Sequence, residues 1–534
     1  MMTKAWRAGL LSSAALIAMA AAPVTKAQAQ AAPAATAAEP DQLSDVVVTA
    51  QRRNERLQDV PVSVVAVSNA ALERARIENV ADLHRLVPSL VVTQGITVMQ
   101  PFLRGVGSLT ATPGNEASIP IYVDGIYYAR LPQALLEFNN VERVEVLKGP
   151  QGTLFGRNAT GGLVQIVTKD PSSTPSLKLT GGYGNYDTTR ATFYGTSGVL
   201  GDKVTADLSL SYKHQGDGWG QNVTTHQDIY KENFFAARTK WNFELSPTLL
   251  FKLSADYVYT NTSVGLIGAP YRGTTQGNPV GLPSVIFPSL PGFYDLRASI
   301  NPYEHENIYG ISGRLEKDLG FAKLISISAY RIGKTDVYND TDYVPIDWTG
   351  SDQVNKYNQV SEELQLASKS GGRLEWVGGL YFLRSIDGAV ANNFGLSANG
   401  INSAFFGQQT AKSYAAYGQA TYKILPDTSL TGGLRYTYDD ISARGRTDLQ
   451  TTTTNTIGTL TTASKSFDKL TWKVSLDHKF NDDFMVYATQ SRGYKSGLFP
   501  TILFRPTPVN PEVLDAYEVG FKSELFDRRL AIHL

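Results

Sequence analysis

The sequence predicts an all-β transmembrane barrel preceded by a smaller α+β domain, and three observations support this fold class. From Leu177 onward, apolar and polar side chains alternate in repeated runs. The connections between these runs alternate between short turns and long polar loops. No apolar stretch after the N-terminal leader reaches the roughly 18 residues of a transmembrane helix, so a membrane span would have to be made of strands.

Composition excludes several other classes of protein. The chain has 534 residues, 49 Lys+Arg against 49 Asp+Glu, 18% charged residues and no Cys. A neutral chain without a basic run is not typical of a nucleic-acid binder. The lack of Cys excludes thiol catalysis and Cys-based metal sites. The 6 His form no close pair and no catalytic constellation is found, so we expect neither an enzyme nor a bound metal or cofactor.

Residues 1–29 are expected to be a secretory signal peptide. Lys4 and Arg7 precede a mostly apolar run that ends at Ala22, and Ala27 and Ala29 supply the small residues of a cleavage site.

Residues 30–44 are rich in Ala, Pro and Gln, a composition that predicts a flexible periplasmic linker.

The barrel is expected over residues 177–534. Val204, Ala206 and Leu208 alternate with Thr205 and Asp207, and five further runs repeat the pattern. Each run is close to the ~10 residues that a tilted membrane strand requires. Tyr and Trp gather near the ends of the runs, as in the aromatic girdle of outer-membrane barrels.

Connections of alternating length predict a barrel with short turns at one end and long loops at the other. Short turns are expected at 200–203, 318–321 and 425–428, and long loops at 385–412 and 439–469. We count about fourteen strands, the last of which is only beginning at 527–532. An open barrel leaves two unpaired edges, so we expect the chain to be the N-terminal part of a longer protein.

The region before the barrel predicts a compact α+β domain within residues 51–170. Strands are expected at 61–68, 89–93, 120–128, 141–148 and 162–169, with one helix after residue 68 and another over 80–86. A short β-prone run comes first: Asp45, Val46, Val47, Val48, Thr49 and Ala50. This run is either the first strand of the domain or a strand donated to a partner by β-augmentation.

Three stretches of this region resemble the plug domain of TonB-dependent outer-membrane receptors. Residues 102–107 read FLRGVG, residues 122–128 read YVDGIYY, and residues 141–162 read VERVEVLKGPQGTLFGRNATGG. The third stretch is the most specific. Similarity continues at 433–436 (GLRY), 491–497 (SRGYKSG) and 517–525 (YEVGFKSEL), so the resemblance covers essentially the whole mature chain.

The resemblance implies a monomeric barrel of about 22 strands in the bacterial outer membrane, with the plug in its lumen and the run at residues 45–50 as the TonB box. The plug apex would lie at 94–104 and 109–118, with Met99, Gln100 and Phe102 as candidate cargo contacts. The expected residues of the plug motifs and of the plug–barrel contacts are Arg104, Gly105, Asp124, Gly125, Glu142, Arg143, Glu145, Lys148, Gly149 and Arg157.

The resemblance also implies active import driven by TonB and its inner-membrane energising complex, with ferric siderophores as the leading cargo. Cobalamin, haem, an oligosaccharide or an aromatic compound are alternative cargoes for the same machine. A passive porin or surface receptor is less well supported, because diffusion requires neither a plug nor a TonB box. The Gly-rich run at 149–156 is similar to a phosphate-binding loop, but no Gly-Lys-Ser/Thr follows it.

Overall fold

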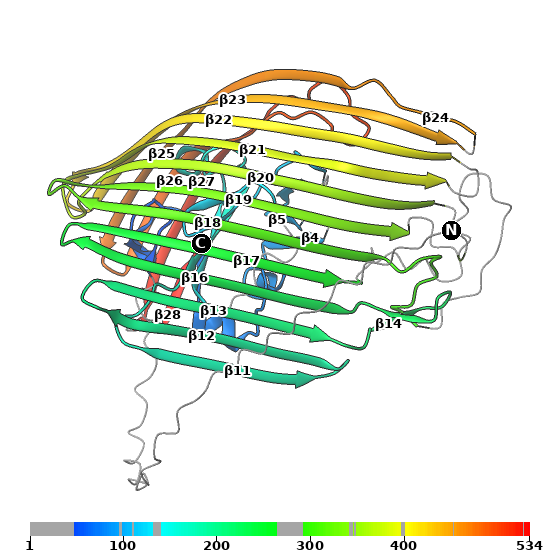
Figure 1. Ribbon diagram of the computed structural model, residues 1–534. Coiled ribbons are helices and arrows are strands. Elements are labelled where there is room, and N and C mark those ends of the chain that lie inside the picture. Colours follow the sequence, from blue (N-terminus) through cyan, green and yellow to red (C-terminus); the bar gives the residue numbers. More distant parts are fainter. Residues whose placement is uncertain are drawn as a thin grey trace, which may run out of the picture. The chain divides into compact units, whose positions relative to one another are not determined.

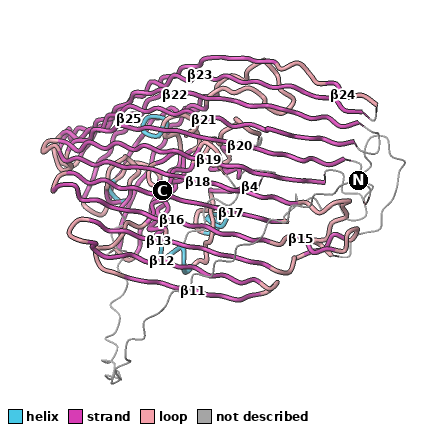
Figure 2. Tube along the Cα trace, viewed as in Figure 1, coloured by secondary structure: helices cyan, strands magenta, loops and turns pink. Residues whose placement is uncertain are grey.

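The computed structural model describes residues 47–94, 99–108, 112–131, 140–263, 292–340, 345, 349–396, 401–451, 453–526 and 528–534. The expected signal peptide and linker, together with Asp45 and Val46, lie outside the described residues. Strands dominate the rest, and the few helices are short (Figure 2). No helix in these ranges is long and apolar enough to cross a membrane.

Residues 47–168 form an N-terminal domain of short strands and helices. Its elements are β1 (Val47–Val48), β2 (Glu55–Arg56), η1 (Leu57–Asp59), β3 (Val64–Ser68), α1 (Asn69–Arg74), η2 (Ala81–Arg85), β4 (Leu90–Gln94), β5 (Met99–Leu103), β6 (Val106–Gly107), β7 (Ile121–Val123), β8 (Ile126–Tyr128), β9 (Val141–Lys148), α2 (Gly152–Phe155) and β10 (Gly162–Thr168).

One five-stranded sheet organises the domain, in the order β3-β9-β10-β7-β8. The strand β9 lies between β3 and β10 and buries Val144 and Val146 on either side of the buried Glu145. Helix α1 begins where the Ser68 side chain accepts a hydrogen bond from the backbone N–H of Ala71, as an N-cap residue does. Leu72 of α1 then packs into the same core.

Two tight hairpins carry the expected motif residues of the domain. Arg104 and Gly105 connect β5 to β6, and Asp124 and Gly125 connect β7 to β8, all with positive φ. Two consecutive residues with positive φ define the type I′ turn, which matches the twist of the paired strands. The region expected as one strand at 120–128 is therefore a hairpin, because Asp-Gly reverses the chain.

The second part of the chain is one large antiparallel sheet, counted as sixteen strands in the described residues. Its members are β11 (Ser176–Gly184), β12 (Thr188–Leu200), β13 (Val204–Gln215), β16 (Glu232–Ser246), β17 (Leu249–Thr262), β18 (Tyr303–Asp318), β19 (Ala322–Asp340), β20 (Thr349–Ser368), β21 (Leu374–Leu396), β22 (Ile401–Leu425), β23 (Thr428–Thr451), β24 (Asn455–Thr456), β25 (Thr461–Asn481), β26 (Phe484–Lys495), β27 (Glu512–Leu525) and β28 (Leu530–His533). A small separate ribbon is formed by β14 (Gly220–Asn222) and β15 (Gln227–Ile229).

The sheet has an apolar outer face and a polar inner face, the reverse of a water-soluble sandwich. On β23, Leu434 and Tyr436 are 58% and 50% exposed, whereas Arg435 and Thr437 between them are 3% and 1% exposed. Lipid on the outside and a filled polar lumen on the inside account for this pattern. The predicted barrel class is confirmed.

The sheet curves around the N-terminal domain, whose blue and cyan elements lie within the bend of the green and yellow strands (Figure 1). Ion pairs join the domain to strands far apart in the sheet, among them β16, β20 and β27. In the described residues, β11 and β28 stand at the two ends of the strand order and do not pair with each other.

Two segments that the sequence predicts as long loops are mostly strand, so these two predictions are wrong. Residues 385–412 belong largely to β21 and β22, and residues 439–469 largely to β23 and β25. These strands are 21 to 25 residues long, far beyond the ~10 that a bilayer requires. Beyond the lipid, both faces of a strand can carry polar residues. The strands therefore stay paired through their backbones even where apolar and polar side chains no longer alternate.

Candidate functional site

The N-terminal segment Val47–Ala50 is seated in the domain rather than projecting from it. Strand β1 pairs with β2, with Val47 opposite Arg56 and Val48 opposite Glu55. Val48 is fully buried and Ala50 is nearly so, both in the cluster that contains Leu147 and Leu163. The strand is therefore held by backbone pairing on one edge and by apolar packing beneath.

Glu145 fastens the end of this segment. Its carboxylate accepts hydrogen bonds from the backbone N–H of Thr49, at 2.9 and 3.0 Å, and from the Thr49 hydroxyl at 3.0 Å. The Arg143 guanidinium donates to the same carboxylate at 2.8 Å. Burial raises the pKa of Glu145, and these charge-assisted donors counteract it. We call Glu145, Thr49 and Arg143 the segment latch.

The residues directly after the segment are tied to the inner wall of the sheet. Arg52 forms a buried ion pair with Glu363 of β20 at 3.1 Å, and its guanidinium lies 4.4 Å from the centre of the Phe155 ring. Arg53 pairs with Glu375 of β21. Both side chains are almost entirely enclosed, so these pairs are worth more than the ~0 to 1 kcal/mol of exposed ones.

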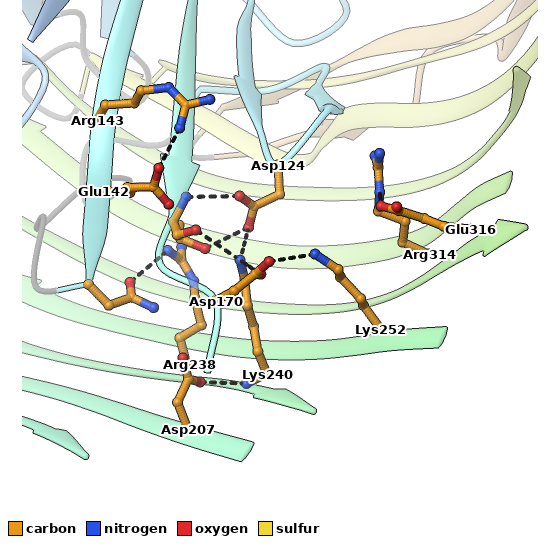
Figure 3. A network of polar contacts seen from close by, with 12 residues as sticks. Asp124, Glu142, Arg143, Asp170, Asp207, Arg238, Lys240, Lys252, Arg314 and Glu316 are labelled. Atoms are coloured by element: carbon orange, nitrogen blue, oxygen red, sulfur yellow. Dashed lines mark hydrogen bonds and ion pairs between the residues drawn. The ribbon is translucent and has the colours of Figure 1, made fainter. Parts of the chain in front are cut away.

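Asp124 and Lys240 form the centre of a second tie, between the β7–β8 hairpin and β16 (Figure 3). The Lys240 ammonium lies 3.1 Å from Asp124 and 3.4 Å from Asp170, and it donates to the carbonyl of Thr168 at 3.1 Å. Burial acts to raise the pKa of Asp124, but Lys240 and the hydrogen bonds from Thr168 outweigh it, so the pKa lies below its usual value. Lys252 adds a cation beside Asp170.

A third tie is fully buried and centres on Arg157. This guanidinium pairs with Glu116 from the loop before β7 and lies 3.5 Å from Asp439 of β23. Asn158 and Tyr127 also donate hydrogen bonds to Glu116. Burial raises the pKa of Glu116, and Arg157 opposes that shift.

The loop at residues 112–117 is clamped between the wall strands. The Gly114 N–H donates to Asp387 at 2.9 Å, and Gln409 donates to the Gly114 carbonyl at 2.8 Å. Asp387 also pairs with Arg130 at 3.0 Å. We call this arrangement the loop clamp, and through Glu116 it connects directly to the buried Arg157 tie.

Several cavities border the clamped loop, and two of them have Thr112 and Asn115 in their lining. Met99 and Gln100 line a small one together with Arg130 and Asp387. The larger cavity, of about 400 Å³, lies between the loop and the β26–β27 connection. Its lining combines one cation and one carboxylate with neutral polar and apolar groups: Thr112, Asn115, Lys495, Ser496, Leu498, Pro500, Thr501, Ile502, Val509, Asn510 and Glu512. Phe102 lines neither cavity, and its ring packs over Gly107.

The other plug residues predicted from the sequence make different kinds of contact. Arg104 pairs with Glu518 of β27 at 3.2 Å, whereas Arg143 pairs with Glu142 and Glu145 of its own strand. Lys148 lines a cavity that Glu518 also borders. The turn residues have positive φ: Gly105, Gly125 and Gly149.

Sequence reasoning missed the wall partners of these residues: Lys240, Glu363, Asp387, Asp439 and Glu518. It also missed Glu116. Each of them is one polar residue among many on an inward-facing strand position or loop, so only the register of the strands identifies it. The alternation of apolar and polar residues along each strand predicts which side chains point into the barrel. It does not predict which plug residue each of them contacts.

Comparison with known proteins agrees with this geometry. The family model for the "TonB dependent receptor-like, beta-barrel" matches residues 149–534, and the "TonB-dependent Receptor Plug Domain" matches residues 56–163. The chain therefore belongs to the TonB-dependent receptor family, whose barrels lie in the bacterial outer membrane. The N-terminal domain is the plug.

Individual relatives point in the same direction. The pesticin receptor of Yersinia pestis is 25% identical over 514 residues, which cover 91% of this chain and 69% of the receptor. The ferric yersiniabactin uptake receptor FyuA from Yersinia pestis has a similar structure, with a TM-score of 0.74, 22% identity and coverage of 87% and 70% of the two chains. The siderophore receptor PiuA from Acinetobacter baumannii gives a TM-score of 0.72, 17% identity and coverage of 89% and 72%.

Proposed function

We propose that this receptor imports ferric siderophores across the outer membrane with energy delivered through TonB, and that the segment at residues 45–50 is its TonB box. The observation that carries the proposal is the seated β1 segment. It is held by two residue pairs with the single strand β2 and by the latch at its end. A pulling partner can replace this attachment by pairing with the same backbone.

The route of force follows from the strand order of the plug. Strand β3 is the first long strand after the segment, and it stands at the edge of the plug sheet, where it pairs with β9 alone. Tension on residues 45–50 therefore reaches β3 before any central strand. Arg52 and Arg53 also tie the early part to the wall, so tension has to break these two ion pairs first. Asp124 and Arg157 anchor the later part of the plug through Lys240 and Asp439. We propose that the early part leaves and the anchored part stays, by local unfolding.

The cargo is proposed to bind in the cavities beside the loop clamp. Their lining offers hydroxyl, amide and apolar contacts with a balance of one Lys and one Glu in the larger cavity. Such a surface suits a hydrogen-bonding chelate whose iron is already wrapped by its own ligands. The similar structures named as a ferric yersiniabactin uptake receptor and a siderophore receptor support this cargo class.

Uptake of radioactive ferric siderophores by a deletion strain of the native host, complemented with this receptor, tests the proposal. Val47→Pro removes a backbone donor from β1, so energised uptake should be lost while ferric-siderophore binding to the cells is retained. Val47→Ala keeps the strand and serves as the control. Loss of binding together with uptake in Val47→Pro would contradict the assignment of the TonB box.

The same assay separates the alternative cargoes. Cobalamin, haem, oligosaccharides and aromatic compounds are supplied in turn to the complemented strain. Accumulation of one of these, with no response to any ferric chelate, would retain the transport mechanism and reject the siderophore cargo. Uptake that continues after the proton-motive force is collapsed would favour a passive porin.

A further inference from the structure

A cavity of about 130 Å³ lies between the plug and the inner wall, beside the turn that follows β9. Residues 148–151 of the plug border it on one side, and β25, β26 and β27 border it on the other. Its volume is far more than the roughly 10 to 15 Å³ that one water needs. The loop at residues 112–117 does not line this cavity, so it is separate from the proposed cargo site.

The lining of this cavity carries an excess of positive charge. Two cations, Arg104 and Lys148, come from the plug, and a third, Lys473, comes from β25. Glu518 of β27 is the one carboxylate among the described lining residues. Two positive charges are therefore left without a balancing carboxylate in the lining. We call it the basic cavity.

The charge of Glu518 is already used by other groups. One carboxylate oxygen lies 3.2 Å from the Arg104 guanidinium. The other accepts hydrogen bonds from the Tyr487 hydroxyl at 2.9 Å and from the Ser63 N–H at 3.2 Å. Glu518 acts on Lys148 and Lys473 only from a greater distance, so it does not neutralise the two lysines.

Lys473 is a buried cation that borders this cavity. It is 6% exposed, and within the described part of the chain its ammonium group forms no hydrogen bond and no direct ion pair. Glu55 and Asp477 act on its charge but lie outside the lining. Burial raises the pKa of Glu55 to about 7, so near neutral pH Glu55 carries only part of a negative charge. Lysine is almost never buried without a partner.

Lys148 adds a second cation from the plug. Its backbone N–H donates to the Ser63 carbonyl at 2.9 Å, which fixes its position at the end of β9. Its ammonium group also has neither a hydrogen bond nor a direct ion pair to any residue that the structure describes. Burial and the charge of Arg104 lower the pKa of Lys148. An anion in the cavity would relieve the repulsion among these cations.

We propose that the basic cavity binds a tetrahedral oxyanion of the phosphate class, with free inorganic phosphate as the ligand. A phosphate group carries roughly −1.5 to −2 charge at pH 7, which matches the two unbalanced positive charges. Lysine ammonium groups bind phosphate oxygens as point charges. Ser491, the register partner of Lys473, offers a hydroxyl in the same lining. The bound oxyanion joins Lys148 of the plug to Lys473 of the wall.

Calorimetric titration of the full chain, purified in detergent in a phosphate-free buffer, tests the proposal with inorganic phosphate as the probe. We expect saturable binding. Lys473→Met removes the ammonium group and keeps an unbranched apolar stem, so it should weaken phosphate binding at least tenfold. Lys148→Gln should weaken it by a similar factor. Sulfate, a tetrahedral dianion, should compete with phosphate, whereas chloride at the same ionic strength should not.

Thermal unfolding distinguishes loss of binding from loss of folding. Without phosphate, Lys473→Met should unfold at or above the wild-type temperature, because the variant no longer buries an unpaired charge. Phosphate should raise the midpoint of the wild type but not that of Lys473→Met.

Lys465→Met is the matched control, since Lys465 is an exposed cation on the same strand and outside the cavity. Its phosphate binding should equal that of the wild type. Equal phosphate binding in the wild type and Lys473→Met, or no binding by the wild type at millimolar phosphate, would overturn the proposal. Displacement of phosphate by chloride at the same ionic strength would also overturn it, because it would indicate charge screening without a site.

Discussion

Glu145 is the side chain on which the seating of the N-terminal segment depends most. It is fully buried and accepts three hydrogen bonds from Thr49 while Arg143 balances its charge. Hydrogen bonds to a charged group contribute about 1.5 to 3 kcal/mol each. These hydrogen bonds therefore hold the segment in place, and they are few enough for a partner that pulls on the segment to break them.

Replacing the latch carboxylate by an amide should release the segment. In Glu145→Gln we expect backbone hydrogen exchange over residues 47–56 to be at least tenfold faster, because the charge-assisted bonds to Thr49 are lost. Glu73→Gln is the control, since Glu73 lies in the same domain, makes no contact with the latch and has about half of its side chain exposed. Equal exchange rates in Glu145→Gln and the wild type would show that the latch does not hold the segment.

Glu55 makes the seating dependent on pH. It lies opposite Val48, and burial raises its pKa to about 7, with Arg53 opposing and Glu375 adding to the shift. Because the folded pKa is above the unfolded value of 4.5, the folded form favours the protonated acid. The stabilisation is present below pH 4.5 and is lost as the pH rises through 7, by an amount on the order of 3 kcal/mol.

Segment opening should therefore be greater at pH 8 than at pH 5. Hydrogen exchange of residues 47–56, corrected for the intrinsic pH dependence of exchange, measures it. Glu55→Gln should remove the difference, because the amide does not titrate. A corrected rate that is the same at both pH values in the wild type would contradict this account of Glu55.

At the residue scale, the sequence could indicate which motif residues lie in the plug but not their partners. Asp124 and Arg104 were expected in plug motifs, and their positions at Asp-Gly and Arg-Gly turns explain why those motifs need glycine. Lys240 and Glu518 could not be chosen in advance, because their roles depend on strand register across the lumen.

Among the elements, the loop at residues 112–117 connects the cavities to the buried centre of the plug. One side of the loop lines both cavities, and the other side carries Glu116, which pairs with Arg157. Occupation of the cavities therefore acts on a loop that is already bonded to the anchored part of the plug.

Loosening this loop should weaken cargo binding. Asp387→Asn removes the ion pair with Arg130 while keeping an acceptor for Gly114, so we expect the dissociation constant of the ferric siderophore to rise about tenfold, or ~1.4 kcal/mol. Fluorescence titration of the purified receptor measures it. Asp468→Asn on the exposed face of β25 is the control. An unchanged dissociation constant in Asp387→Asn would show that the loop clamp does not contribute to cargo binding.

Elements were predictable where side-chain periodicity persists. The turns expected at 200–203, 318–321 and 425–428 are confirmed, since strands alternate strictly on either side of them. The sequence does not predict strand β5 or helix α2, because β5 contains Pro101 and α2 is a single turn of four residues. The polar outer halves of β21 to β25 were taken for loops, because pairing there depends on the neighbouring strand and not on lipid.

At the scale of the whole molecule, the proposed transport mechanism divides the plug into a part that moves and a part that stays. The early part comprises β1, β2 and the edge strand β3. The later part is tied to the wall through Asp124, Arg157 and Arg130. The chain contains no Cys, so a single engineered disulfide can test the division without competing thiols.

The most direct test is ferric-siderophore uptake by cells that carry Val67→Cys and Val144→Cys. These residues are register partners on β3 and β9, at a separation that suits a disulfide. The account predicts that the oxidised receptor binds cargo but does not import it, that reductant restores import, and that each single variant imports in both conditions. Import at the wild-type rate by the fully oxidised receptor would contradict the claim that β3 leaves β9 during transport.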